Sequence, residues 1–145
     1  MKELVDHILF VASVNRKSVT QLQLHKISYF ALGYLLKIGE EEKARQLYKD
    51  EHFQAWSYGP VLPKTYERFN RFKSTPILDV GENSIQLSQI PNFNELIIKY
   101  IRRNIFELVK LSHSNYFWKE NSNRVRRNLR PEYTFTDLKR DFRIE

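Results

Sequence analysis

The stretch TQLQLHKISYFALGYLLKI, residues 20–38, carries the most regular pattern of the chain and decides its fold. Its large apolar residues recur at helical spacing and form one continuous stripe, made of Ile27, Phe30, Ala31, Tyr34, Leu35 and Ile38. Ser18 or Thr20 can cap the start of this helix, and Gly39 stands where a helix commonly ends. The pattern therefore predicts a long helix that buries the stripe in the core.

Three residues of this stretch lie beside the apolar stripe. Lys26, Tyr29 and Gly33 share a neighbouring face of the helix at positions i, i+3 and i+7. A glycine inside a helix costs about 1 kcal/mol relative to alanine, so Gly33 indicates that another part of the chain approaches closely. Two interpretations stay open: a second packed face with a lysine whose stem is buried, or a face that binds a partner.

Several other segments have helical spacing. A first helix is expected over residues 2–14, and a second long core helix over residues 92–111. Shorter helices are expected at residues 40–48, at residues 63–72 and, capped by Thr136 and ending at Phe142, within the C-terminal segment 132–145. Residues 121–131 are polar and basic and are expected to form a loop.

Two segments indicate β structure. Residues 52–59 alternate and are rich in aromatic side chains, so they are expected to be extended. The runs PILDV and SIQLS within residues 76–88 predict a hairpin whose turn is Gly81, Glu82 and Asn83. The sequence thus predicts a mainly α (α+β) fold over residues 1–145, a single compact helical domain with two long core helices and a small β-hairpin element.

Composition restricts the class of protein. The chain has 145 residues, 41% of them apolar, which suits one domain with a core. It contains no cysteine, which excludes disulfides, cysteine-ligated zinc and a thiol nucleophile. Glu3 and Asp6 argue against a secretory signal, and no apolar run approaches the roughly 20 residues that cross a bilayer. We expect a cytoplasmic protein without a membrane partner.

The positive charge is concentrated in the last third of the chain. Residues 1–98 hold 12 Lys and Arg against 11 Asp and Glu, whereas residues 99–145 hold 12 against 6. Much of this excess lies in the segment RVRRNLR, as a basic patch of Arg124, Arg126, Arg127 and Arg130. Such a surface favours an acidic partner, either nucleic acid or an acidic protein face, although solubility alone would also explain it.

No motif of a catalytic or metal site is recognisable. The four glycines are isolated, so there is no phosphate-binding loop, and the four histidines share no metal-ligand spacing. A carboxylate pair or a Ser–His–Asp arrangement assembled by the fold stays open, but no nucleophile elbow is visible. We therefore expect a protein that is not an enzyme, with no metal and no cofactor.

The segment FQAWSYGPVLPKTY, residues 53–66, crowds aromatic side chains around a turn. Trp56 and Tyr58 precede the Gly59-Pro60 turn, which sets the local geometry. Tryptophan and tyrosine held on a rigid turn are typical anchors of binding interfaces. The alternative is that Trp56 belongs to the core.

A third segment, LSHSNYFW at residues 111–118, follows the second long helix. It places His113 close to Trp118 in sequence, together with two further aromatic residues. A buried histidine bonded to the backbone and a catalytic base are the two interpretations of His113, and no second catalytic group supports the latter.

These three segments, in this order, resemble the Panacea antitoxin-domain family, also described as SocA-like or phage-associated. LHKISYFALGY is similar to the family's LQKLLYFA-G-Y helix, AWSYGPVLPKTY to its AW-x-YGPV-x-P-x-x-Y segment, and SHSNYFW to its late His and Trp element. The resemblance covers most of residues 5–120. His25 stands where the family commonly has glutamine, and Ser28 where it has an aliphatic residue.

The resemblance implies an antitoxin of a toxin–antitoxin pair. Family members neutralise toxins of several unrelated classes, some of them by direct binding, and one relative presents its toxin to a protease. The pattern falls on residues that we expect to contact the partner: Lys26, Tyr29, Trp56, Tyr58, Gly59, Pro60, His113 and Trp118. Alternatives are a nucleic-acid-binding regulator that uses the basic last third, or a mobile-element inhibitor of another host system. The class of toxin and the oligomeric state stay open.

Overall fold

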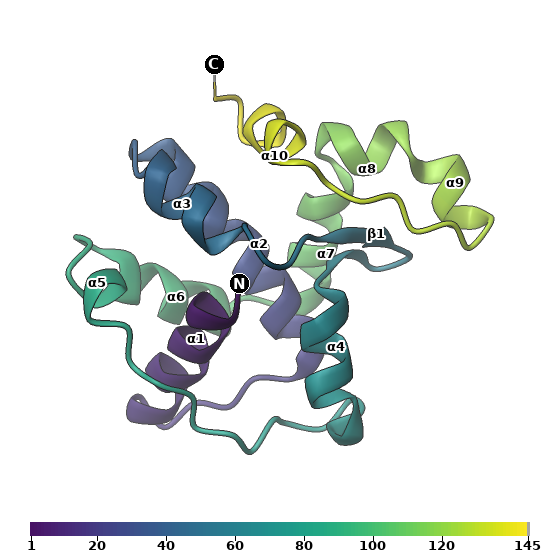
Figure 1. Ribbon diagram of the computed structural model, residues 1–145. Helices are drawn as coiled ribbons and strands as arrows, with labels where there is room; N and C mark the ends of the chain where they lie inside the picture. The colour runs from purple at the N-terminus through teal and green to yellow at the C-terminus, as the bar shows by residue number, and fades with distance from the viewer. Residues whose placement is uncertain (145) are drawn as a thin grey trace.

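Helix α2, Gln21–Lys37, runs through the centre of the molecule (Figure 1). Thr20 caps it: the Thr20 hydroxyl accepts the Gln23 N–H while the Gln23 side chain accepts the Thr20 N–H. At the other end Gly39, with φ +86°, turns the chain away, and Glu40 N–H donates to the Leu35 carbonyl. The predicted long helix and its terminal glycine are therefore confirmed, with Thr20 rather than Ser18 as the cap.

The computed structural model describes residues 1–144, which form a mainly helical single domain. The elements around α2 are, in chain order, α1 (Lys2–Val14), α3 (Glu41–Leu47), β1 (Gln54–Trp56), β2 (Gly59–Val61), α4 (Pro63–Phe69), η1 (Asn70–Phe72), α5 (Ile85–Ser88), α6 (Phe93–Arg102), α7 (Ile105–His113), α8 (Tyr116–Glu120), α9 (Ser122–Arg126) and α10 (Phe135–Asp141). Helices α1, α3, α6, α7 and α10 and strand β2 all pack against α2.

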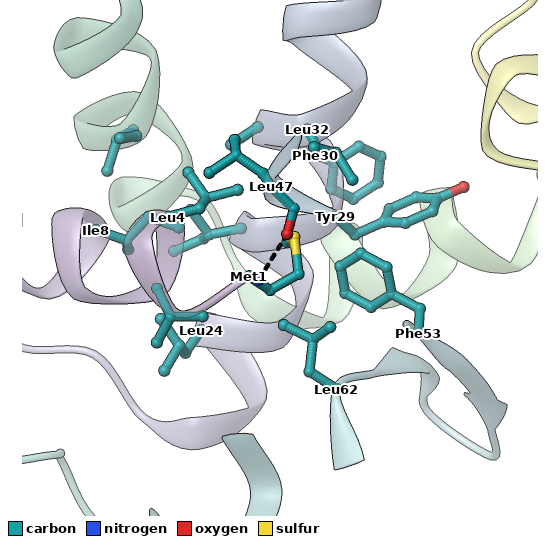
Figure 2. Close-up of a cluster of buried hydrophobic side chains, with 14 of the residues drawn as sticks. Met1, Leu4, Ile8, Leu24, Tyr29, Phe30, Leu32, Leu47, Phe53 and Leu62 are labelled. Atoms are coloured by element: carbon teal, nitrogen blue, oxygen red, sulfur yellow. Dashed lines mark hydrogen bonds between the residues drawn. The ribbon is translucent and has the colours of Figure 1, made fainter. Parts of the chain in front are cut away.

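Helix α2 is buried on nearly all sides, which explains its second face. Figure 2 shows Tyr29 beside Phe53, whereas Leu4 of α1 lies on the opposite side of the cluster. Tyr29 and Lys26 are fully buried, and a Cβ at Gly33 would overlap the Phe142 ring. The face beside the apolar stripe is thus packed, and the lysine on it does not reach water.

Residues 76–88 do not form the hairpin that their alternation predicts. The chain from residue 76 to residue 84 is irregular, and its N–H groups bond separately to distant partners: Ile77 N–H to the Val19 carbonyl and Glu82 N–H to the Asp6 carbonyl. Gly81 is needed for close packing, because a Cβ there would overlap that same Asp6 carbonyl. Tertiary partners therefore replace the cross-strand bonds that the local pattern predicts.

The second long core helix is also a wrong prediction, since residues 92–111 form two helices. Asn104 interrupts the run: its side chain accepts the Phe106 N–H at 2.8 Å and caps a new helix, α7. Asparagine competes with the helical backbone for hydrogen bonds in this way. The break lets α7 leave α6 at an angle and continue toward the hairpin (Figure 1).

Two corrections concern the C-terminal part. Residues 121–131 are not a basic loop throughout, because Ser122–Arg126 form helix α9. The last helix is capped by Thr134 rather than Thr136, and Asp137 completes a capping box with it. The polar composition of residues 121–131 gave no signal for the helix at Ser122–Arg126. Thr134, two residues before Thr136, caps the last helix.

The β element is a two-stranded antiparallel hairpin at residues 54–61. Trp56 pairs with Gly59, and Ser57 and Tyr58 form the connection. The C-terminal chain runs along the other edge of β1, where Ala55 N–H donates to the Pro131 carbonyl and Tyr133 N–H to the Phe53 carbonyl. The predicted extended segment 52–59 is thus confirmed in part, and it is held between β2 and the C-terminal chain.

The turn at Gly59 generates a prediction about stability. Gly59 has φ +104°, and a Cβ there would overlap the Ser112 hydroxyl. Gly39 also has a positive φ but no atom within 4 Å of its Cβ position, so Gly39→Val isolates the backbone strain. We expect Gly39→Val to cost about 1–2 kcal/mol. Gly59→Val should cost at least ~1 kcal/mol more through overpacking. Urea denaturation measures both, and equal losses would contradict a steric role for Ser112.

Candidate functional site

An open groove of about 660 Å³ lies where the start of α2, the hairpin, the start of α7 and the chain after α9 meet. Its walls are mainly apolar and aromatic, with a few polar groups, as is usual for binding sites. The lining residues are Thr20, Gln21, Leu22, His25, Trp56, Ser57, Tyr58, Val61, Tyr66, Lys73, Ser74, Ile105, Phe106, Val125, Asn128, Leu129 and Arg130. We call this feature the aromatic groove.

Three large apolar side chains of the aromatic groove are open to solvent. Phe106 is 67% exposed, Tyr58 is 60% exposed and Leu129 is 52% exposed. Each lies at a connection or at the end of an element: Tyr58 in the hairpin connection, Phe106 in the first turn of α7, and Leu129 in the chain after α9. Three separate segments thus contribute exposed apolar surface to one hollow.

Trp56 forms a fixed part of the same wall. The Arg130 guanidinium lies 3.9 Å from the centre of the Trp56 ring, and the Tyr66 ring packs 5.0 Å from it. The Trp56 carbonyl accepts the indole N–H of Trp118 at 2.8 Å. These contacts hold the tryptophan in one orientation, with an arginine beside it at the rim.

Lys26 supports the hairpin from below. It is fully buried, and its Nζ donates to the Pro60 carbonyl at 2.9 Å. Burial lowers the pKa of Lys26 to about 7, since the charged amine loses its hydration. Lys26 therefore links α2 to the turn. The free-energy cost of burying its amine is larger when the amine is protonated.

His25 lies buried at the base of the aromatic groove. Its Nδ1 accepts the Leu62 N–H at 3.2 Å, which assigns the ring proton to Nε2. Within residues 1–144, that Nε2 has no hydrogen-bond partner. Burial, and then the charge of Lys26, hold the pKa of His25 well below its usual value, so the ring is neutral at pH 7.

His113 packs behind the hairpin. Its ring stacks on Trp118 at 3.7 Å between centroids, and burial lowers its pKa. The charge of Lys26 also lowers the pKa of His113, as it does that of His25. In the described part of the chain, no hydrogen bond joins either histidine to a carboxylate.

The fold brings together most of the residues that the sequence singled out. Trp56 and Tyr58 line the aromatic groove, whereas Gly59 and Pro60 are buried beneath it with Lys26. His113 and Trp118 brace the hairpin from behind without lining the groove. The buried residues of this predicted set therefore support the surface of the aromatic groove and do not form it.

Tyr29 is the one predicted contact that lies elsewhere. It is buried among aromatic rings in the core, including Phe53 and Phe142. Its hydroxyl donates to the Asp141 carboxylate at 2.7 Å and accepts from the Asn115 amide at 2.7 Å. Tyr29 thus joins α2 to the C-terminal helix, away from the aromatic groove.

The predicted basic patch is exposed and only partly joined to the groove. Arg124 and Arg126 lie in α9, Arg127 follows it, and only Arg130 lines the aromatic groove. None of the four forms an ion pair with another residue of the range 1–144. Their charges are therefore available to a partner.

Most residues that line the groove were not singled out from the sequence, and Phe106, Leu129 and His25 are three of them. Phe106 was expected within one continuous helix over residues 92–111. It lies off the apolar stripe of that helix, and this position was the signal that could have identified it. Leu129 was the single leucine among the arginines of RVRRNLR. The signal at His25 was that it stands where the similar family commonly has glutamine, but its role depends on the hairpin packed above it.

Within residues 1–144, no three His, Asp or Glu side chains gather in a group that could hold a metal ion. Over the same residues, no helix combines the length and the apolar character that a membrane span requires. The chain matches no protein-family model, no curated protein and no solved structure. The motif resemblance rests on three segments, and these contact one another: Lys26 bonds to Pro60, and Trp118 to Trp56.

The buried Lys26 predicts how stability changes with pH. Its pKa is about 7 in the folded chain and 10.5 when unfolded, so the unfolded state binds more protons between these values. Stability should rise by about 2–3 kcal/mol from pH 7 to pH 9.5, and Lys26→Met should remove that rise. Urea denaturation across this range measures both proteins. An equally steep rise in Lys26→Met would assign the effect to another group.

Proposed function

We propose that this protein is a cytoplasmic antitoxin that neutralises a cognate protein toxin by direct binding at the aromatic groove. The observation that carries the proposal is the exposure of Tyr58, Phe106 and Leu129 around one open hollow. The resemblance of residues 24–34, 53–66 and 111–118 to the Panacea family supports the antitoxin role. The protein acts by binding and not by catalysis.

Exposed apolar side chains that share one hollow favour a protein partner. A single exposed apolar residue is ordinary, but a contiguous patch is typical of an interaction site. Tyr58 and Phe106 are aromatic, and aromatic anchors contribute much of the affinity when a partner removes water from them. Leu129 extends the patch toward the basic end of the molecule.

The rigidity of the walls supports tight binding. Trp56 is held by Arg130, Tyr66 and Trp118, and the hairpin rests on Lys26. A surface that is already ordered loses little conformational entropy when it binds. Neutralisation therefore needs no reorganisation of the hairpin, and delivery of the bound toxin to a protease is compatible with the same contact.

A second candidate function is a nucleic-acid-binding regulator. The observation that favours it is the group of exposed arginines, Arg124, Arg126, Arg127 and Arg130, without ion pairs in the described chain. Binding to duplex DNA would weaken as salt rises, with a logarithmic slope of about −0.9 per phosphate neutralised. Removal of Arg124 and Arg127 should reduce the slope by roughly 2, whereas removal of exposed Lys49 should not. No measurable DNA binding at low salt would exclude this candidate.

The antitoxin proposal predicts that groove variants lose neutralisation. Phe106→Ala and Leu129→Ala should each weaken toxin binding by about tenfold or more, because an interface anchor contributes at least ~1.4 kcal/mol. The control is Leu78→Ala, which shortens a leucine that is 78% exposed outside the groove.

In the assay, the protein is expressed together with the candidate toxin encoded by the gene next to its own. Cell growth reports neutralisation, and a pull-down reports binding. Melting temperatures of the variants should match that of the original protein, since the altered side chains are exposed. If both groove variants neutralise the toxin fully, the toxin contacts another surface. If only Leu78→Ala loses neutralisation, that surface includes the segment around residue 78.

A further inference from the structure

We propose that the aromatic groove accepts a partner segment in which an apolar side chain is flanked by carboxylates. This inference rests on the proposed function and adds the chemistry of the partner. It combines three features of the groove: an apolar hollow, positive charge without acidic side chains, and a buried hydrogen-bond donor.

The charge of the aromatic groove has one sign. Lys73 and Arg130 line it, and no Asp or Glu is found among the lining residues of the described chain. Lys73 follows η1 and Arg130 follows α9, so the two cations come from separate segments. Neither forms an ion pair with residues 1–144, which leaves both free to meet carboxylates.

The hollow between these cations suits an apolar side chain. Tyr58, Phe106 and Leu129 are each more than half exposed, and an apolar group placed among them would remove them from water. The volume of about 660 Å³ is large enough for more than one side chain. A desolvated apolar centre with charge at its edge is the usual arrangement of protein interfaces.

His25 adds a specific polar contact at the base. Its Nε2–H is buried and has no partner in the range 1–144, and a buried unpaired donor is unfavourable until an acceptor arrives. The lowered pKa keeps the ring neutral at pH 7, so this donor offers a hydrogen bond without a charge. Because its Nε2 has almost no exposed surface, a carboxylate or carbonyl oxygen of the partner would satisfy it only after a small displacement of the side chains around it.

These features favour a protein segment over a nucleic acid. Nucleic-acid affinity comes largely from many phosphate contacts, and the aromatic groove offers only two cations. Arg124, Arg126 and Arg127 lie outside its lining, so a backbone of phosphates in the groove would miss them. An acidic and apolar peptide uses both the walls and the two cations.

The test uses the full chain and a displayed library of random 12-residue peptides. Binders are selected on the original protein and counter-selected on Phe106→Ala/Leu129→Ala, which leaves peptides that need the groove. We expect the enriched peptides to carry an aromatic or aliphatic residue with Asp or Glu within three positions. An enriched set without acidic excess would overturn the inference.

Charge reversal then separates contact from long-range attraction. Arg130→Glu and Lys73→Glu should each weaken a selected acidic peptide by tenfold or more. The matched control is Arg127→Glu, which makes the same charge change three residues from Arg130 and outside the groove lining. We expect it to weaken binding by less than threefold, and an equal loss would overturn the inference. Lys73→Glu provides a second measurement because Arg130 also packs on Trp56.

A final comparison distinguishes this inference from the proposed function. If Phe106→Ala abolishes neutralisation of the toxin while Arg130→Glu and Lys73→Glu do not affect it, the antitoxin role stands and the acidic partner is rejected. If a random 20-nucleotide single strand competes with the selected peptides and loses affinity in Phe106→Ala, the groove is a nucleic-acid site and the inference is likewise rejected. If acidic peptides bind tightly to the groove while Phe106→Ala and Leu129→Ala neutralise the toxin normally, only the proposed function is rejected.

Discussion

The hydrogen bond from the buried Lys26 amine to the Pro60 carbonyl is the contact that anchors the candidate functional surface. A lysine with no exposure to solvent must find a polar partner inside the protein, and the hairpin turn supplies it. The bond fixes the turn on the central helix, so Trp56 and Tyr58 stand above α2 in one position. The aromatic groove exists because this turn is anchored.

The molecule separates its aromatic residues into two environments with different roles. In the core, Tyr29 packs against Phe53 and Tyr133 and uses its hydroxyl to hold the C-terminal helix through Asp141. At the aromatic groove, the rings of Tyr58 and Phe106 remain largely in water. Core burial stabilises the fold, whereas exposed rings add little to folding stability and would gain free energy only if another surface removed them from water, which is why the groove and not the core suits a partner.

Sequence reasoning identified the elements whose signals are local. The stripe of residues 20–38, the Thr20 cap and the glycine at residue 39 all act within a few residues, and the structure confirms them. It failed at residues 76–88, where backbone groups bond to α1 and to Val19 instead of to each other. It also failed at Asn104, because an apolar stripe does not reveal a side chain that caps a new helix.

The sequence by itself determined a helical chain, the identity of the central helix and an extended segment within residues 52–59, since periodicity, caps and turn residues are encoded by near neighbours. Only the tertiary structure decided that Lys26 is buried, that His25 has a donor without a partner in residues 1–144, and that Leu129 lines the same groove as residues of α2. These properties belong to surfaces formed by distant segments. No spacing along the chain specifies which of those surfaces come into contact.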